Sequence, residues 1–191
     1  MAELDEFLDG ESRPPAKGTL GTESRWLHFC DLDLRSGRLL VIDPSFAPYE
    51  QDGLLVDLPV TRYTVSAKVL DYGTEKRVSR LQVVTRLAEA TLGPEIGKTW
   101  SDTARTGVCD YQLYKEAWGD DERGWQIVGP TLEELSSGVA VLDEAAGAIL
   151  PFLESGFGDG EFPVFELLDG HSNSRVGIEV QFIAQGEPYP F

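Results

Sequence analysis

The stretch RYTVSAKVLDYGTEKRVSRLQVV, residues 62–84, decides the fold class of this chain. Apolar and polar residues alternate over 63–69, a turn sequence Asp-Tyr-Gly-Thr follows at 71–74, and the alternation resumes over 78–87. A period of two is the side-chain period of a β-strand with one face in the core and one in water. The stretch therefore predicts a β-hairpin.

Segments on both sides of this hairpin also predict strands. Residues 38–42 form a short apolar run that an Asp-Pro pair closes. Residues 162–168 are almost continuously apolar, as in a strand that is covered on both faces. Residues 176–182 alternate again after a turn-rich segment at 169–174, so they predict a second hairpin.

Helix signals are few and short. Asp110 can cap a helix that runs to Trp118 and ends at the glycine after it. Thr131 and Glu134 have the spacing of a capping box, which predicts a brief helix there. Residues 145–153 are ambiguous, because their alanines favour a helix while a glycine and a proline interrupt it. We therefore expect an α+β fold, mainly antiparallel β-sheet with a few short helices.

Length and composition favour one domain. The chain has 191 residues, of which 41% are hydrophobic and 26% charged, as in an ordinary globular protein. Residues 1–20 are acidic and then rich in Pro and Gly, so they predict a flexible segment before a single β-rich domain at 21–191. The first residues lack the layout of a signal peptide, and no apolar run is long enough for a membrane helix. We expect a cytoplasmic protein with reduced cysteines.

The net charge is the least ordinary property of the chain. There are 33 acidic and 16 basic residues, a net charge of −17, and no Lys or Arg lies between Gly124 and Ser174. Such a field repels nucleic acid and anionic membranes, and it speeds the approach of a basic protein partner. We therefore expect a basic protein partner, no nucleic acid and no membrane, with the oligomeric state left open. The alternative interpretation is that the acidic residues only keep the protein soluble.

The stretch SGFGDG, residues 155–160, has the composition of a phosphate cradle, a metal loop or a tight corner. A phosphate loop would be followed by a helix, and a calcium loop needs more oxygen ligands than this stretch supplies. Gly156, Gly158 and Gly160 permit positive φ, and Asp159 can accept hydrogen bonds from nearby amides. We expect a structural corner.

A second stretch, WGDDERGW at 118–125, joins aromatic and acidic residues. An aromatic anchor ringed by carboxylates suits a surface that recognises a basic protein. The alternative is that the tryptophans are core residues and the acids form a solvated loop. The candidate partner-binding residues are Trp118, Asp120, Asp121, Glu122 and Trp125.

Catalytic residues are expected only under a second hypothesis, because no Gly-x-Ser-x-Gly, HExxH, CxxC or Walker motif occurs. Under that hypothesis Asp159, Asp169 and His171 converge on a metal ion. Cys109 would be a nucleophile if His28 came near, and a small buried hydrophobe otherwise. A metal-dependent or cysteine-based hydrolase is thus the alternative to a non-catalytic binding protein, for which no cofactor and no metal are expected.

The run SGFGDGEFPVFELLDG…RVGIEVQFI, residues 155–183, resembles the closing segment of a bacterial family catalogued only as a domain of unknown function, number 4241 in that series. Members end in a Ser-Gly-x-Gly-Asp-Gly corner, a strand, an Asp turn and a last strand with Asp-Phe, where this chain has Gln181-Phe182. SGRLLVIDP at 36–44 and TGVCD at 106–110 resemble earlier family segments. The resemblance implies a β-rich domain without established chemistry. Because members look like neighbours of bacterial toxin systems, it also implies an immunity-type protein that neutralises a basic toxin.

Overall fold

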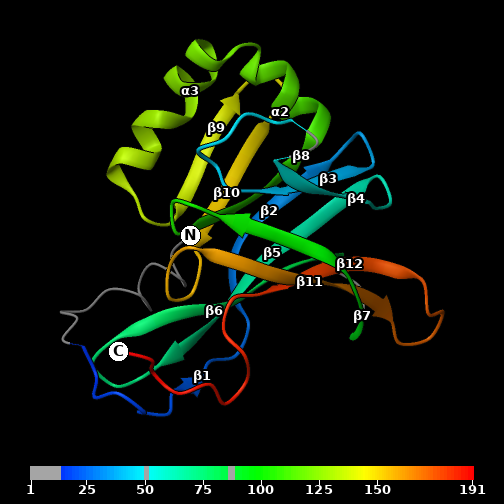
Figure 1. Cartoon of the computed structure of the whole chain (residues 1–191). Helices are drawn as coiled ribbons and strands as arrows, with labels where there is room; N and C mark the ends of the chain where they lie inside the picture. Colours follow the sequence, from blue (N-terminus) through cyan, green and yellow to red (C-terminus); the bar gives the residue numbers. More distant parts are fainter. Residues whose placement is uncertain (1–13, 50–51, 86–88) are drawn as a thin grey trace.

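The computed structural model describes residues 14–49, 52–85 and 89–191, which form two antiparallel sheets and two helices (Figure 1). The seven-stranded sheet contains β1 (Thr22–Glu23), β2 (Leu27–Leu34), β5 (Thr61–Asp71), β6 (Lys76–Thr85), β7 (Ala90–Ser101), β11 (Gly160–Asp169) and β12 (Arg175–Gln181). The five-stranded sheet contains β3 (Arg38–Ile42), β4 (Gly53–Asp57), β8 (Arg105–Asp110), β9 (Gly138–Asp143) and β10 (Ala148–Glu154). The helices are α2 (Tyr111–Trp118) and α3 (Asp121–Glu134). The structure is β-rich and antiparallel, consistent with the expected α+β class.

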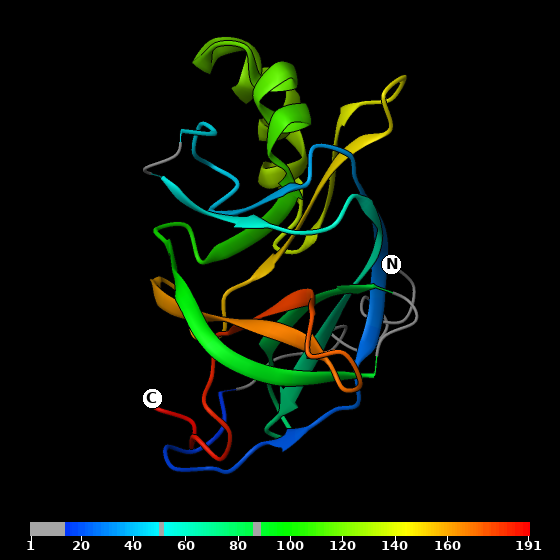
Figure 2. The same ribbon diagram turned by 90° about the vertical axis from the view of Figure 1, so that its right-hand side faces the viewer.

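The elements stack in three layers (Figure 2). The large sheet has the order β1-β5-β6-β12-β11-β7, with β2 also paired to β5, and the small sheet has the order β4-β3-β8-β10-β9. The small sheet lies between the large sheet and the helices, so both of its faces are covered. In β3, Leu39 and Val41 join the core between the sheets, while Leu40 and Ile42 join the core beneath the helices. This explains why the sequence of β3 is apolar without alternation.

Both predicted hairpins are confirmed. β5 pairs with β6, and β11 pairs with β12, each antiparallel. Residues 86–87 of the first predicted hairpin lie outside the described residues. The prediction that 162–168 is covered on both faces is wrong, because Val164 is buried whereas Pro163 and Phe165 are only half-buried. β11 belongs to an outer layer, so only one of its faces packs fully against the rest of the protein.

Helix α2 forms as the sequence predicts. The Asp110 carboxylate accepts hydrogen bonds from the amides of Gln112 and Leu113, at 3.0 and 3.1 Å, and so caps the helix. Gly119 ends the helix with a φ of 67°, a conformation that favours glycine. The cap and the terminator are local features, and for this reason they are readable in the sequence.

Helix α3 overturns the prediction of a brief helix at a capping box. Asp120 caps α3 by accepting the Arg123 amide at 3.0 Å, and the helix continues past Thr131, which lies inside its last turn. Gly124 and Pro130 weaken the helix signal of this segment, since both residue types are unfavourable within helices. The ambiguous residues 145–153 belong to a turn and to strand β10 rather than to a helix.

The N-terminal segment is described only from residue 14, so most of the predicted flexible segment, residues 1–13, lies outside the described residues. The part from Gly18 to Leu20 pairs with the C-terminal stretch. The Gly18 amide donates to the Tyr189 carbonyl at 2.9 Å, and Leu20 bridges to Pro188. Residues 18–20 are therefore attached to the β-rich domain, which moves its start toward residue 18. In the part of the chain that the structure describes, neither helix has the length and apolar character for crossing a membrane.

Candidate functional site

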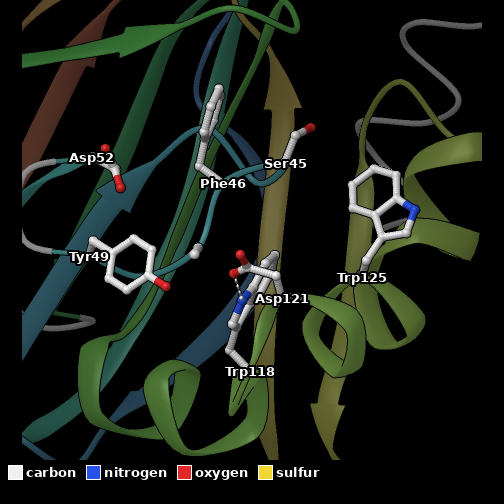
Figure 3. Close-up of a pocket in the computed structure, with 8 residues that line it drawn as sticks. Ser45, Phe46, Tyr49, Asp52, Trp118, Asp121 and Trp125 are labelled. Atoms are coloured by element: carbon white, nitrogen blue, oxygen red, sulfur yellow. Dashed lines mark hydrogen bonds between the residues drawn. The ribbon is translucent and has the colours of Figure 1, made fainter.

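A groove of about 300 Å³ lies between the loop that follows β3 and the helices α2 and α3 (Figure 3). We call it the aromatic–acidic groove. Its main lining residues are Phe46, Tyr49 and Asp52 from the loop and Trp118, Asp121 and Trp125 from the helices. Among the described residues that line it, none is Lys, Arg or His.

Asp43 fixes the start of the loop that forms one wall of the groove. Its side chain is fully buried and accepts hydrogen bonds from the amide of Ser45 at 3.0 Å and from those of Asp102 and Thr103 at 2.9 Å each. The Thr103 hydroxyl donates to the same carboxylate at 2.8 Å. One carboxylate thus joins this loop to the turn between β7 and β8.

Phe46 then attaches the loop to the helical wall. Its carbonyl accepts the hydroxyl of Tyr114, a residue of α2, at 3.0 Å, and its ring packs edge-on against Trp100 at 4.8 Å between centroids. Burial raises the pKa of the Tyr114 phenol, so the hydroxyl stays a donor at neutral pH. The loop wall is therefore held both to the β7–β8 turn, through Asp43, and to helix α2, through Phe46.

Trp118 forms the floor between the two walls. Its side chain is 6% exposed, it packs edge-on against Tyr114 at 5.3 Å, and its Nε1 donates to the Asp121 carboxylate at 3.3 Å. A Cβ added at Gly124 would lie 2.1 Å from the Trp118 ring, so only glycine lets α3 approach this indole. The sequence hypothesis treated Trp118 as a partner contact. The structure places most of this residue in the core.

Trp125 and Tyr49 are the exposed aromatic residues of the groove, at 45% and 52%. Trp125 lies over Gly129, whose added Cβ would be 3.1 Å from the indole. Asp121 and Trp125 are four residues apart on α3 and therefore share one helix face. An aromatic ring and a carboxylate of this segment thus line one groove. Their role as partner contacts stays a prediction.

The three consecutive acids occupy the beginning of α3 rather than a loop. Asp120 is the cap, and Asp121 and Glu122 lie in the first turn, where negative charge interacts favourably with the helix dipole. Tyr49 and Asp52 were missed by sequence reasoning, because they lie about seventy residues before Asp121. The aromatic and acidic composition of the 49–52 segment was the only available signal.

The SGFGDG corner, residues 155–160, contacts the turn between β7 and β8. Gly156 and Gly158 have positive φ values of 57° and 124°, as predicted, whereas Gly160 does not and already begins β11. That part of the prediction is wrong, because an extended strand needs no positive φ. Asp159 accepts the amide of Ala104 at 2.8 Å, and Ala104 is itself in the left-handed region with φ 56°. The corner thus holds the β7–β8 turn, to which Asp43 also binds.

The residues of the hydrolase hypothesis do not come together. Asp159 and Asp169 lie at opposite ends of β11, a ten-residue strand that spans about 30 Å. His171 donates its backbone amide to Asp169, and the Ser172 amide and hydroxyl together with this bond lower the Asp169 pKa. Asp169 therefore shapes its own turn. Within the described ranges, no three His, Cys, Asp or Glu side chains gather in a way that would hold a metal ion.

The surroundings of both cysteines are those of side chains that pack in the protein interior. Cys109 lies on β8 with no exposed surface, in the core beneath the helices, and burial raises its pKa. Cys30 is half-buried on β2, and burial raises its pKa to about 12. A nucleophilic cysteine is a thiolate at neutral pH, so both environments oppose that role.

We expect both thiols to resist a thiol reagent in the folded protein. At pH 8 a pKa of about 12 leaves a thiolate fraction on the order of 10⁻⁴, so Cys30 should react at least about 100-fold more slowly than an exposed cysteine. The release of thionitrobenzoate from Ellman's reagent, with and without guanidinium, measures this. Two equivalents should appear rapidly only after unfolding. One equivalent released within seconds by the folded protein would contradict the assignment.

A scan of protein-family models, a search of curated proteins and a search of solved structures each found no match to this chain. The family resemblance noted in the sequence therefore remains a hypothesis carried by the quoted segments.

Proposed function

We propose that this chain is a non-catalytic protein that binds a basic protein partner at the aromatic–acidic groove. One observation carries the proposal: exposed Trp125 and Tyr49 line the same groove as Asp52 and Asp121. Exposed aromatic anchors with charged surroundings are typical of binding hot spots, and the charge selects the partner.

The distribution of charge supports a basic partner. The chain carries a net charge of −17, and the segment from Gly124 to Ser174 contains no Lys or Arg although it runs from α3 into the turn before β12. Negative fields of this kind increase the association rate with positively charged proteins. The resemblance to a family beside toxin systems supports a narrower form: an immunity-type protein that occludes a basic toxin in the bacterial cytoplasm. The geometry does not favour the hydrolase hypothesis, because Asp159 and Asp169 lie at opposite ends of β11 and Cys109 is buried.

Charge removal at the groove should slow association. The double variant Asp52→Asn with Asp121→Asn removes both charges that line the groove while leaving the Asp120 cap intact. The binding partner in this test is the product of the adjacent gene. At 0.01 M salt the variant should associate with it several-fold more slowly than the unmodified protein does. The difference in on-rate between the variant and the unmodified protein should be smaller at 0.15 M salt, because the Debye length falls from about 30 Å to about 8 Å. Trp125→Ala should mainly raise the off-rate, by roughly 30-fold for a hot-spot loss of about 2 kcal/mol.

The matched control removes the same charge from the far end of α3. Glu133→Gln with Glu134→Gln changes two exposed acids that do not line the groove. Surface plasmon resonance at the two salt concentrations compares the variants. If the unmodified protein does not bind at either salt concentration, the proposal is wrong. Equal on-rates for the two double variants would show that the groove is not the binding site.

A further inference from the structure

We propose that the aromatic–acidic groove receives a single arginine side chain of the partner. This inference rests on the proposed function and specifies its ligand. The groove volume of about 300 Å³ lies at the small end of the range for ligand pockets, roughly 300–1,000 Å³. It therefore suits one side chain rather than a larger ligand.

The hydrogen-bonding character of the lining favours a ligand that only donates. Asp52 and Asp121 are acceptors when ionised, and the Ser45 hydroxyl donates to the Thr103 hydroxyl at 3.3 Å. The indole nitrogen of Trp125 points away from Asp121 in Figure 3, so that carbon atoms of the ring face the groove. A group that carries positive charge and donors without acceptors matches this lining, and Arg and Lys are the side chains with that character.

Geometry favours guanidinium over ammonium. A guanidinium is planar, stacks on aromatic rings and can donate two parallel hydrogen bonds to one carboxylate. Trp125 and Tyr49 supply aromatic rings in the groove, and the Asp121 carboxylate lies between them in Figure 3. The bond from Trp118 Nε1 orients that carboxylate before any ligand arrives. An ammonium would gain the charge interaction and lose the stacking and the second parallel bond.

The beginning of α3 does not repel the cation. A helix N-terminus carries about half a positive charge, which by itself favours anions. Here three carboxylates, those of Asp120, Asp121 and Glu122, occupy the same end of the helix. Arg123 in the same turn reduces their formal charge from −3 to −2, which still outweighs the half charge of the dipole, so the net field at this end attracts a cation.

The indole N–H signals of the intact protein test the assignment directly. The chain has four tryptophans, and Trp26, which packs with Lys68 on the large sheet, is an internal reference. N-acetylarginine amide should shift the Trp125 and Trp118 signals saturably, with a dissociation constant in the millimolar range. N-acetyllysine amide should bind at least about threefold more weakly. N-acetylcitrulline amide, a neutral compound of nearly the same shape, should give no saturable shift.

Asp121→Asn should weaken arginine binding at least tenfold. The asparagine oxygen can still accept the Trp118 bond, so the fold is retained. Asp57→Asn is the control, because Asp57 is exposed at the far end of β4 and the substitution changes the net charge equally. Citrulline binding as tight as arginine binding, lysine binding as tight as arginine binding, or an unaffected Asp121→Asn variant would each overturn the inference.

The outcomes separate this inference from the proposed function. A partner whose binding depends on Trp125, yet persists when each of its arginines is replaced by lysine, would overturn the arginine assignment alone. Arginine amide binding without any association to the product of the adjacent gene would overturn the proposed function alone. Saturable arginine binding together with loss of partner binding in Asp121→Asn supports both.

Discussion

Replacing Gly177 by alanine should remove about 3 kcal/mol from the free energy of unfolding, the upper end of the usual cost of overpacking. Gly177 lies in β12, between β6 and β11, opposite Val84 and Leu167. An added Cβ would lie 2.0 Å from the carbonyl oxygen of Val83 and 2.8 Å from the Val84 Cα. Both atoms belong to the backbone of β6, so the methyl group fits only if β6 and β12 separate in the middle of the large sheet.

Gly93→Ala is the matched control for this prediction. It also introduces one methyl group into a strand of the large sheet, but the new Cβ would meet the side chains of Glu166 and Leu168, at 2.9 and 3.1 Å. Side chains rotate at low cost and backbones in a sheet do not. Chemical denaturation followed by circular dichroism compares the two variants. A Gly177→Ala midpoint equal to that of Gly93→Ala would show that the sheet relaxes around the methyl group.

Replacing Asp110 by alanine should cost about 3–4 kcal/mol. Its side chain is 2% exposed, and the carboxylate accepts four backbone amides. One oxygen binds those of Gln112 and Leu113 at the start of α2, and the other binds those of Arg35 and Ser36 at 2.7 Å each, before β3. Alanine leaves these donors with no partner in a part-buried site, and the penalty is a large share of a typical stability of 5–15 kcal/mol.

Asp169→Ala tests whether burial causes that penalty. Asp169 also accepts several donors, from His171 and Ser172, but in an exposed turn. Its freed donors can bind water, so the loss in stability should be much smaller than that of Asp110→Ala. The loss in stability of Asp110→Asn should lie between those of the two alanine variants, because the amide keeps one acceptor oxygen. Equal losses for the two alanine variants, measured by urea denaturation, would refute the role given to burial.

The Asp110 variant also bears on the groove. Asp110 caps α2, which carries Tyr114 and Trp118, and these residues attach the loop and form the floor of the groove. A weakened α2 should therefore loosen the arginine site. In the sequence, Asp110 is recognisable as the cap of α2 and Asp43 as the end of the strand at 38–42, but their more distant partners are not. Their role as anchors of loops depends on amides far away in the chain.

Three residues that line the groove, Trp118, Asp121 and Trp125, are among the candidate contacts that the sequence singles out. Trp125 and Asp121 were found because both lie in one short segment whose composition is unusual. Tyr49 and Asp52 were not, because they reach the groove only when the loop after β3 packs against the helices. Helix α3 was missed for a related reason: Gly124 is unfavourable for an isolated helix, but it is required where the helix contacts Trp118.

The hairpins, the cap and end of α2, the positive φ at Gly156 and Gly158, and the acidic field can all be predicted from the amino-acid sequence. Each depends on residues close together in the chain or on composition alone. Three features come from the packing of the layers: both faces of β3 are buried, Gly124 and Gly177 admit no side chain, and two distant segments enclose one groove. These features are contacts between residues far apart in the chain, and they arise only when the layers pack.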